Sequence, residues 1–190
     1  IDSILEEFTF SIYHATDREQ LVSLIEDIDK FGKENGIYRS VLPLINYAER
    51  RIEEYDQQRQ DEALLNLNVK LNPNDPEHRS VVDRKYLEEI GRLDPNDVEG
   101  KLDATKNLIM RYGIIPDSLL KNIDLAGMNM EDEQAFHDAL QLWTMAKGWA
   151  GRTPENILSK YDGINRLDMV RTAMEAGIPF NNAIRSIRAH

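Results

Sequence analysis

The stretch that decides the fold occurs twice: residues 108–123 read LIMRYGIIPDSLLKNI, and residues 169–187 read MVRTAMEAGIPFNNAIRSI. Each contains apolar residues at helical spacing, then a Gly-Ile-Ile-Pro or Gly-Ile-Pro turn, then a second apolar helical segment. Gly113 and Gly177 predict left-handed helix ends, the isoleucine that follows is expected in the core, and the proline starts the next helix. The pattern therefore predicts a tight helical hairpin that is used twice.

Apolar residues at spacings of three and four extend this helical pattern over most of the chain. A capping box at Thr16–Glu19 precedes the second helix, and Gly36 ends it. Ser40 is expected to cap a third helix that has Pro43 in its first turn. The later predicted helices are 76–90, 97–112, 116–126, 131–149, a short one after Pro154, 164–176 and one from Pro179. The fold class is therefore all-α, an array of helical hairpins for which solenoid-like stacking is one arrangement.

The same spacing selects the side chains that are expected to be buried. In the first helix they form one stripe, which consists of Ile1, Ile4, Leu5, Phe8 and Ile12. In the later helices they include Val82, Tyr86, Leu87, Val98, Leu108, Phe136, Trp143, Val170 and Met174. Trp149, near the end of its helix, is instead a candidate interface residue.

Two unusual segments separate the N-terminal helices from the rest. Residues 56–62 contain no hydrophobic side chain, so a helix that continues through them would bridge solvent or lie between subunits. Residues 65–72 read LNLNVKLN, an alternation that is typical of an extended strand with one buried face. A single strand either lies across helices or pairs with another chain at a sheet edge.

A domain boundary is placed within residues 56–75, where the pattern changes. The turn that follows, Asn72 to Pro76, starts a helix with Asp75 as its cap. The chain is thereby divided into an N-terminal helical region with a long third helix, residues 1–66, and a helical-hairpin domain, residues 67–190.

The charge is strongly negative and unevenly distributed. The 190 residues carry 34 acidic and 23 basic side chains, a formal net charge of −11. Residues 1–70 hold 15 acids and 8 bases, residues 71–150 hold 15 and 9, and residues 151–190 hold 4 and 6. So acidic a surface repels phosphate and disfavours tight binding of DNA or RNA. The basic tail either pairs with an acidic region of a neighbouring subunit or is solvated; its residues include Arg166, Arg171, Arg185 and Arg188.

The sequence gives few signals for chemistry. The absence of cysteine excludes disulfides, a thiol nucleophile and a thiolate metal site, and no Gly-x-Gly loop is present. The histidines stand singly, and Asp75 with His78 is better explained as a cap and an exposed side chain than as a metal site. Asp94 to Gly100 departs from a calcium loop at the glycine and at the last ligand. The four histidines are His14, His78, His137 and His190. We predict no catalytic, cofactor-binding or metal-binding residue, no cofactor and no enzyme activity.

From Asn72 onward the chain resembles a segment of the internal virion, or DNA-ejection, proteins of short-tailed bacteriophages. The resemblance covers roughly 115 residues of turn and core positions. The residues that carry it are Asn72-Pro73, His78-Arg79, Val82-Asp83, Tyr112-Gly113-Ile114-Ile115-Pro116, Leu119-Leu120, the helix from Ala135 to Ala146, Ala176-Gly177-Ile178-Pro179 and Ala183-Ile184. Residues 1–66 carry no such resemblance.

The resemblance implies a protein that is packed in the capsid and then reassembles across the host envelope, or periplasm, as a ring or tube. Its partners would be further copies of itself, other ejection proteins and the host envelope, and viral DNA would pass without specific binding. Some relatives carry a lytic transglycosylase domain, so an accessory domain of a peptidoglycan-degrading enzyme is one alternative. A helical adaptor for a basic partner is another. The chain starts at Ile1, without Met, and is therefore expected to be a fragment, a processed product or a late start.

Overall fold

The computed structural model describes residues 1–67 and 70–189, and there the regular structure consists of helices and one isolated β-bridge, which confirms the all-α prediction. The chain divides into two compact units, Ile1–Asn66 and Leu67–His190. The division falls within the stretch 56–75, where the sequence pattern changes. None of the described helices is long and apolar enough to cross a membrane.

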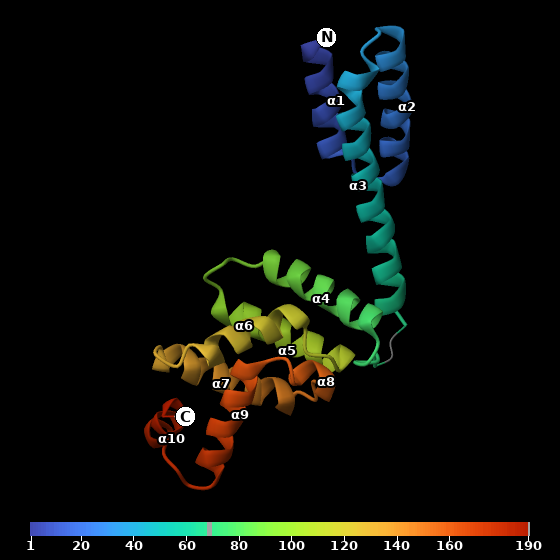
Figure 1. The fold of residues 1–190 in the computed structure, drawn as a ribbon. Helices are drawn as coiled ribbons and strands as arrows, with labels where there is room; N and C mark the ends of the chain where they lie inside the picture. The colour runs from blue at the N-terminus through green and yellow to red at the C-terminus, as the bar shows by residue number, and fades with distance from the viewer. Residues whose placement is uncertain (68–69, 190) are drawn as a thin grey trace. The chain divides into compact units, whose positions relative to one another are not determined.

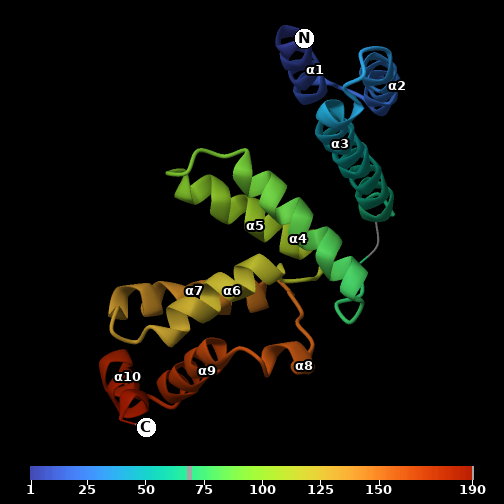
Figure 2. The same cartoon turned by 45° about the horizontal axis from the view of Figure 1, so that its top comes forward.

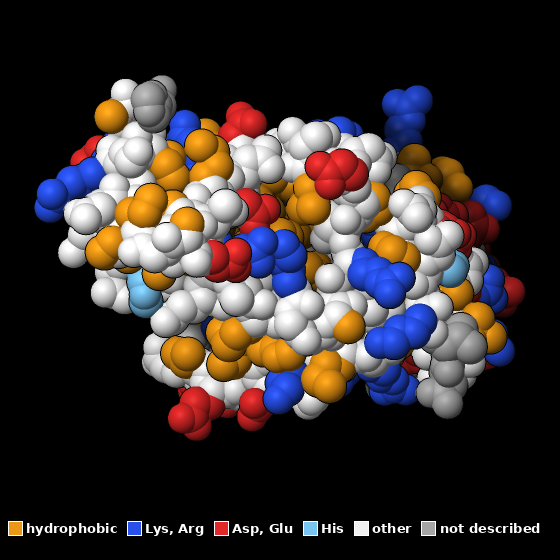
Figure 3. Space-filling model, turned by 90° about the horizontal axis from the view of Figure 1, so that it is seen from below, with side chains coloured by type: hydrophobic (Ala, Val, Ile, Leu, Met, Phe, Trp, Pro, Cys, Tyr) orange, Lys and Arg blue, Asp and Glu red, His pale blue; other side chains and the backbone are white. Residues whose placement is uncertain are grey.

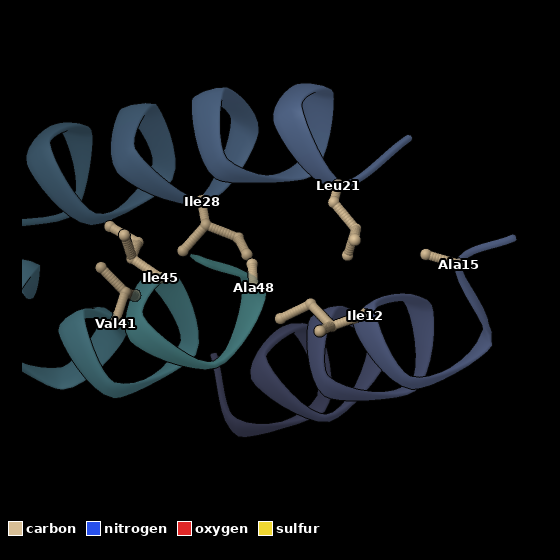
Figure 4. Close-up of a cluster of buried hydrophobic side chains, with 7 residues drawn as sticks. All are labelled: Ile12, Ala15, Leu21, Ile28, Val41, Ile45 and Ala48. Atoms are coloured by element: carbon tan, nitrogen blue, oxygen red, sulfur yellow. The ribbon is translucent and has the colours of Figure 1, made fainter. Parts of the chain in front are cut away.

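The first unit is a bundle of three helices, α1 (Asp2–His14), α2 (Arg18–Glu34) and α3 (Tyr38–Leu65). In Figure 1, α1 and α2 lie beside the first half of α3. Figure 4 shows the side chains that the three helices bury between them: Ile12, Ala15, Leu21, Ile28, Val41, Ile45 and Ala48. Phe8 and Phe31 add an edge-to-face contact with ring centroids 5.7 Å apart. Burial of this apolar stripe holds the bundle together.

The N-cap residue of α2 lies one residue later than predicted. Asp17, not Thr16, is the N-cap, and its carboxylate accepts a hydrogen bond of 2.8 Å from the amide of Gln20. The Gln20 side chain reaches back and accepts from the Thr16 amide at 3.0 Å. Asp17 therefore caps α2, but the return contact goes to the amide of the residue before the cap and not to the amide of the cap itself, as it would in a capping box. Gly36, at φ +62°, follows the end of α2 as predicted.

The third helix is longer than predicted at both ends. It starts at Tyr38, and the N-cap residue, Ile37, makes no side-chain hydrogen bond to the helix. Ser40 is therefore not the cap, and Pro43 lies inside the helix and not in its first turn. The helix continues through the polar residues 56–62 and ends at Leu65. Tyr55 and Arg51 tie it to the turn before α2, since both donate hydrogen bonds of 2.9 Å to the carbonyl of Ala15.

The predicted strand at 65–72 is therefore wrong at its start. Leu65 is the last residue of α3, and Asn66 is a helical C-cap whose amide donates to the carbonyl of Glu62. Helix propagation along α3 overrides the local alternation, because each added residue completes a further backbone hydrogen bond. Residues 68–69 lie outside the described residues. Farther on, Leu71 is buried and its amide donates to the carbonyl of Tyr112, so this segment crosses the end of a helix.

The second unit contains seven helices among its described residues. They are α4 (Pro76–Gly91), α5 (Val98–Tyr112), α6 (Asp117–Met128), α7 (Glu133–Gly148), α8 (Glu155–Leu158), α9 (Asp162–Glu175) and α10 (Phe180–Arg188). Figure 2 shows α4 beside α5, and α6 beside α7. Helix α6 is central, because it packs against α4, α7 and α9, and α9 packs in turn against α10. The helices thus form the predicted array of hairpins.

The two Gly-Ile-Pro turns resemble each other in backbone but not in packing. Gly113 and Gly177 have φ of +74° and +94°, the left-handed helix ends that were predicted. In both turns the proline is the N-cap rather than the first helical residue. The second turn joins α9 and α10, which pack against each other. The first turn joins α5 and α6, but α5 packs on α4, and α6 packs on α4, α7 and α9. Ile178 is 44% exposed, against 1% for Ile114, so the expectation of a buried isoleucine fails in the second turn.

Helical spacing also misplaces several side chains. Leu87, Val98 and Met174 were expected in the core and are 52%, 73% and 38% exposed. Leu87 follows Tyr86, which faces the core, and one residue turns the next side chain about 100° away. Val98 and Met174 lie in the first and last turns of their helices, where the covering neighbour ends. Ile1 and Ile4 are exposed for the same reason, at the beginning of α1.

Candidate functional site

A cluster of polar side chains in the second unit joins α4 to α6 and α6 to α9. Asp83 of α4 accepts hydrogen bonds from the amide and the hydroxyl of Ser118, at 2.8 and 2.7 Å. Ser118 is the second residue of α6, whose N-cap, Pro116, offers no side-chain acceptor. A carboxylate from one helix therefore caps the start of another, where free amides and the helix dipole favour negative charge.

A carboxylate of one helix caps the start of another between α6 and α9 as well. Asp124 of α6 accepts from the amides of Gly163 and Ile164, at 2.7 and 3.2 Å. These residues lie in the first turn of α9, whose own N-cap, Tyr161, makes no capping hydrogen bond. Asp83 and Asp124 were not predicted as caps, because each lies inside a helix and far along the chain from the amides it binds. The available signal was that the N-cap positions of α6 and α9 are Pro116 and Tyr161, which offer no Ser, Thr, Asp or Asn side chain to the first amides.

Two glycines make this contact possible. A Cβ atom on Gly163 would lie 1.9 Å from the carbonyl oxygen of Asp124, and one on Gly127 would lie 2.2 Å from the carbonyl oxygen of Gly163. Real Cβ atoms do not approach other heavy atoms so closely, and backbone cannot move aside cheaply. Glycine at both positions therefore permits α6 and α9 to touch through their backbones.

Arg79 and Tyr161 complete the cluster. The Arg79 guanidinium donates to the Asp117 carboxylate at 2.7 Å, and its side chain is only 15% exposed. Burial raises the pKa of the Tyr161 phenol, and the nearby carboxylates of Asp117, Asp124 and Asp83 raise the pKa further, against an opposing effect from Arg79. The phenol is consequently kept protonated, and the carboxylates are engaged with helix ends and a guanidinium. The polar cluster therefore fixes α4 against α6 and α6 against α9.

A second polar contact joins α7 to α9. The indole of Trp143, which is 1% exposed, donates to the Asp168 carboxylate at 2.8 Å. Arg171 and Lys147 lie 3.4 and 3.9 Å from the same carboxylate. Trp143 is thus a core residue as predicted, and its one polar atom is satisfied. Trp149 is half-buried.

Acidic side chains cap the starts of α4, α5 and α7, and they include those that were considered as metal or calcium ligands. Asp75 accepts from the amide of Glu77 at 2.9 Å, Asp97 from Gly100 at 2.9 Å, and Asp132 from Ala135 at 3.1 Å. Residues 1–67 and 70–189 hold no group of three or more His, Asp or Glu side chains placed to bind a metal ion.

The histidines contact neighbours rather than each other. His78 is half-buried, not exposed as expected, and its Nδ1 accepts a hydrogen bond of 2.9 Å from the amide of Asn72. His14 packs on the ring of Phe10, and His137 meets Phe180 edge to face at 5.2 Å. His190 lies outside the described residues.

The basic residues of the tail are engaged to different degrees. Arg166 donates to the carbonyl of Met128, and Arg188 donates to the carbonyl of Met130 and lies 3.2 Å from Glu133. Arg171 pairs with Asp168. Arg185 is exposed and forms no ion pair in the described part of the chain.

Two open grooves lie outside the polar cluster. One, of about 630 Å³, runs between α1 and α2 and is lined by Phe10, Ser11, His14, Asp17, Glu19, Gln20, Ser23, Leu24 and Asp27. The other, of about 670 Å³, runs between α7 and α9 and is mostly apolar, with Met145 and Met174 in its walls. Figure 3 shows hydrophobic side chains exposed next to Lys and Arg on one face of the molecule. Surfaces of this kind are suited to contact another macromolecule.

The residues that carry the resemblance to ejection proteins hold the second unit together. His78 binds the turn at Asn72, Arg79 binds Asp117, and Asp83 caps α6. Ile114, Ile115, Leu119 and Leu120 are buried. No protein-family model matches this chain, and no similar protein was found among curated proteins or solved structures. The family assignment stays a prediction from these residues.

Proposed function

We propose that this chain is a structural subunit whose copies assemble into a channel, and that the channel guides the DNA of a short-tailed bacteriophage across the host envelope. The observation that carries the proposal is that the polar and the large apolar side chains have different roles. Carboxylates in the second unit close the ends of neighbouring helices, whereas large apolar side chains remain exposed on both units, among them Phe10, Tyr13 and Met169. Exposed apolar faces on each unit are suited to assembly.

The charge of the chain supports a passive relation to DNA. A net charge of −11 repels phosphate, so a wall built from this chain would let DNA slide past without adhering. The phage context rests on the resemblance of residues 72–190, and with it the proposed partners, other ejection proteins, and the proposed locations, the virion interior and later the host periplasm.

Sedimentation velocity of the intact chain, from low to high micromolar concentration and with or without lipid vesicles, tests the proposal. We expect particles of several subunits, which electron microscopy would resolve as rings or tubes. An electrophoretic mobility assay at low salt should show no retention of double-stranded DNA, because low ionic strength strengthens the repulsion. A chain that stays monomeric under every condition would contradict the proposal.

A second candidate function follows from the α1–α2 groove. Three of its lining residues are carboxylates, Asp17, Glu19 and Asp27, and none is Lys or Arg. This favours a helical adaptor that binds a basic partner. Salt-sensitive capture of a basic protein by a monomeric chain would support the adaptor over the channel.

A further inference from the structure

The outer face of α1 has no partner in its own bundle. Leu5, Phe8 and Ile12 turn toward α2 and α3, whereas Phe10 and Tyr13 lie on the other side and are 64% and 65% exposed. The Phe10 ring packs on the imidazole of His14, with centroids 4.1 Å apart. Aromatic side chains of this size contribute much of the binding free energy when an interface covers them.

This face borders the acidic α1–α2 groove. Phe10 and Leu24 supply apolar wall to the groove. Asp17 is engaged as the cap of α2, but Glu19 and Asp27 form no ion pair in the described part of the chain. On the other side of Phe10, a shallower hollow is lined by Glu6 and Glu7. An occupant of this surface must therefore be apolar at its tip and positively charged beside it.

The turn between α9 and α10 has those properties. It is the lowest part of the second unit in Figure 1, and Ile178 at the turn is 44% exposed. Residues 176–189 contain no acidic side chain and two arginines. Arg188 is held by Glu133, but Arg185 is exposed and unpaired in the described chain.

The turn is also firmly built. Ala183 and Ile184 are buried, and Phe180 packs against Phe136 at 6.2 Å between centroids. The amide of Ile178 donates to the carbonyl of Ala173, which closes the end of α9. A preorganised protrusion loses little conformational entropy when it binds.

We propose that the α9–α10 turn of one chain docks into the α1–α2 groove of a second copy. Ile178 would pack against Phe10 and Leu24, and Arg185 would pair with Glu19 and Asp27. The charges match on the larger scale too, since residues 1–66 hold 15 acids and 7 bases. The inference rests on the proposed self-assembly and adds to it the two surfaces that meet.

Such a contact joins different patches on the two copies. Each chain offers one turn and one groove, so every copy in the assembly can engage two neighbours. Repetition of this contact closes into a ring, or continues as a tube, according to the rotation between copies. The geometry would give the proposed channel without a separate interface.

Charge reversal on each surface tests the proposal. Arg185→Glu reverses the charge on α10, the helix that follows the turn, and the double change Glu19→Lys with Asp27→Lys reverses the charge of the groove. Each variant alone should weaken assembly about tenfold or more, because like charges then face one another. The matched controls are Lys121→Glu and Glu54→Lys, at exposed positions of α6 and α3, which should assemble as the parent chain does.

Mixing the variants makes the test specific. A turn variant keeps its groove, and a groove variant keeps its turn. In an equimolar mixture the two variants can therefore alternate through one native and one inverted contact, and larger assemblies should return, although neither variant assembles well alone. Combining both changes in one chain should restore larger assemblies, because the inverted charges again complement each other. Circular dichroism spectra that match the parent chain establish that each variant is folded.

The outcomes separate this inference from the proposed function. If the parent chain assembles and the charge-reversed variants assemble equally well, the docking contact is wrong and the channel proposal stands. If the parent chain never assembles, the channel proposal fails and this inference fails with it. If the variants change the compactness of a monomer but not its mass, the turn occupies the groove of its own chain, and the proposed contact between copies is overturned.

Discussion

In the first unit three helices meet over one apolar stripe, whereas in the second unit carboxylates on one helix also close the ends of the next. The bundle depends mainly on apolar burial, which is not directional, and the hydrogen bonds of Arg51 and Tyr55 to Ala15 add to it. The second unit depends in addition on hydrogen bonds and backbone contacts that fix each helix at one position. Side chains of α3 also close one helix end in the first unit, at the carbonyl of Ala15 after α1, but there they add to a shared apolar stripe. In the second unit the N-caps of α6 and α9 offer no side-chain acceptor, and carboxylates of a neighbouring helix supply it.

The two units can be followed separately. Both tryptophans, Trp143 and Trp149, belong to the second unit, so tryptophan fluorescence reports its unfolding. Far-ultraviolet circular dichroism reports the helices of both units. The predictions below use these two signals in denaturant titrations.

The largest effect is expected in the apolar core of the first unit. Ile28 is fully buried between α2 and α3, and Ile28→Ala should lower the free energy of unfolding by about 3 kcal/mol through lost burial and the cavity left behind. The circular dichroism transition should split or shift, while the fluorescence transition stays in place. An equal shift of both transitions would show that the units unfold as one.

A somewhat smaller effect is expected at the α6–α9 crossing. Gly163→Ala places a Cβ against the carbonyl of Asp124, so the helices must separate, at a cost of about 2–3 kcal/mol in the fluorescence transition. The control is Gly91→Ala at the end of α4, where an added Cβ meets nothing within 4 Å. It should be neutral or stabilise by up to about 1 kcal/mol. Equal behaviour of the two variants would refute the backbone contact.

The long-range caps should contribute less. Asp124→Ala leaves the amides of Gly163 and Ile164 without their acceptor and should cost about 1–2 kcal/mol in the fluorescence transition. Asp103→Ala, an exposed change in the middle of α5, should stay within about 0.5 kcal/mol of the parent chain. If Asp124→Ala were as mild as this control, the cap would make no net contribution to stability.

The smallest effect has the opposite sign. Ala150 follows α7 with φ at +64°, a left-handed conformation in which alanine is strained and glycine is not. Ala150→Gly should therefore stabilise the second unit by about 0.5–1 kcal/mol, visible as a later fluorescence transition. The exposed position of Ala150 keeps this change free of packing effects, and a loss of stability would argue against the strain.

The sequence by itself determined the helices and most of their ends. Apolar spacing fixed the helical class, and Asp75, Asp97 and Gly177 marked boundaries, because caps and left-handed ends depend on residues a few positions apart. What lies within one turn of a helix can be predicted from the chain alone.

Only the tertiary structure decided which helices pair and what closes their ends. The turn at Gly113 was predicted to form a tight hairpin, but α5 packs on α4 and α6 on α4, α7 and α9. Asp83 and Asp124 were invisible as caps, and Leu87 and Val98 were assigned to a core that they do not reach. Each of these depends on the position of a neighbour distant in sequence, and local spacing contains no information on where that neighbour will lie.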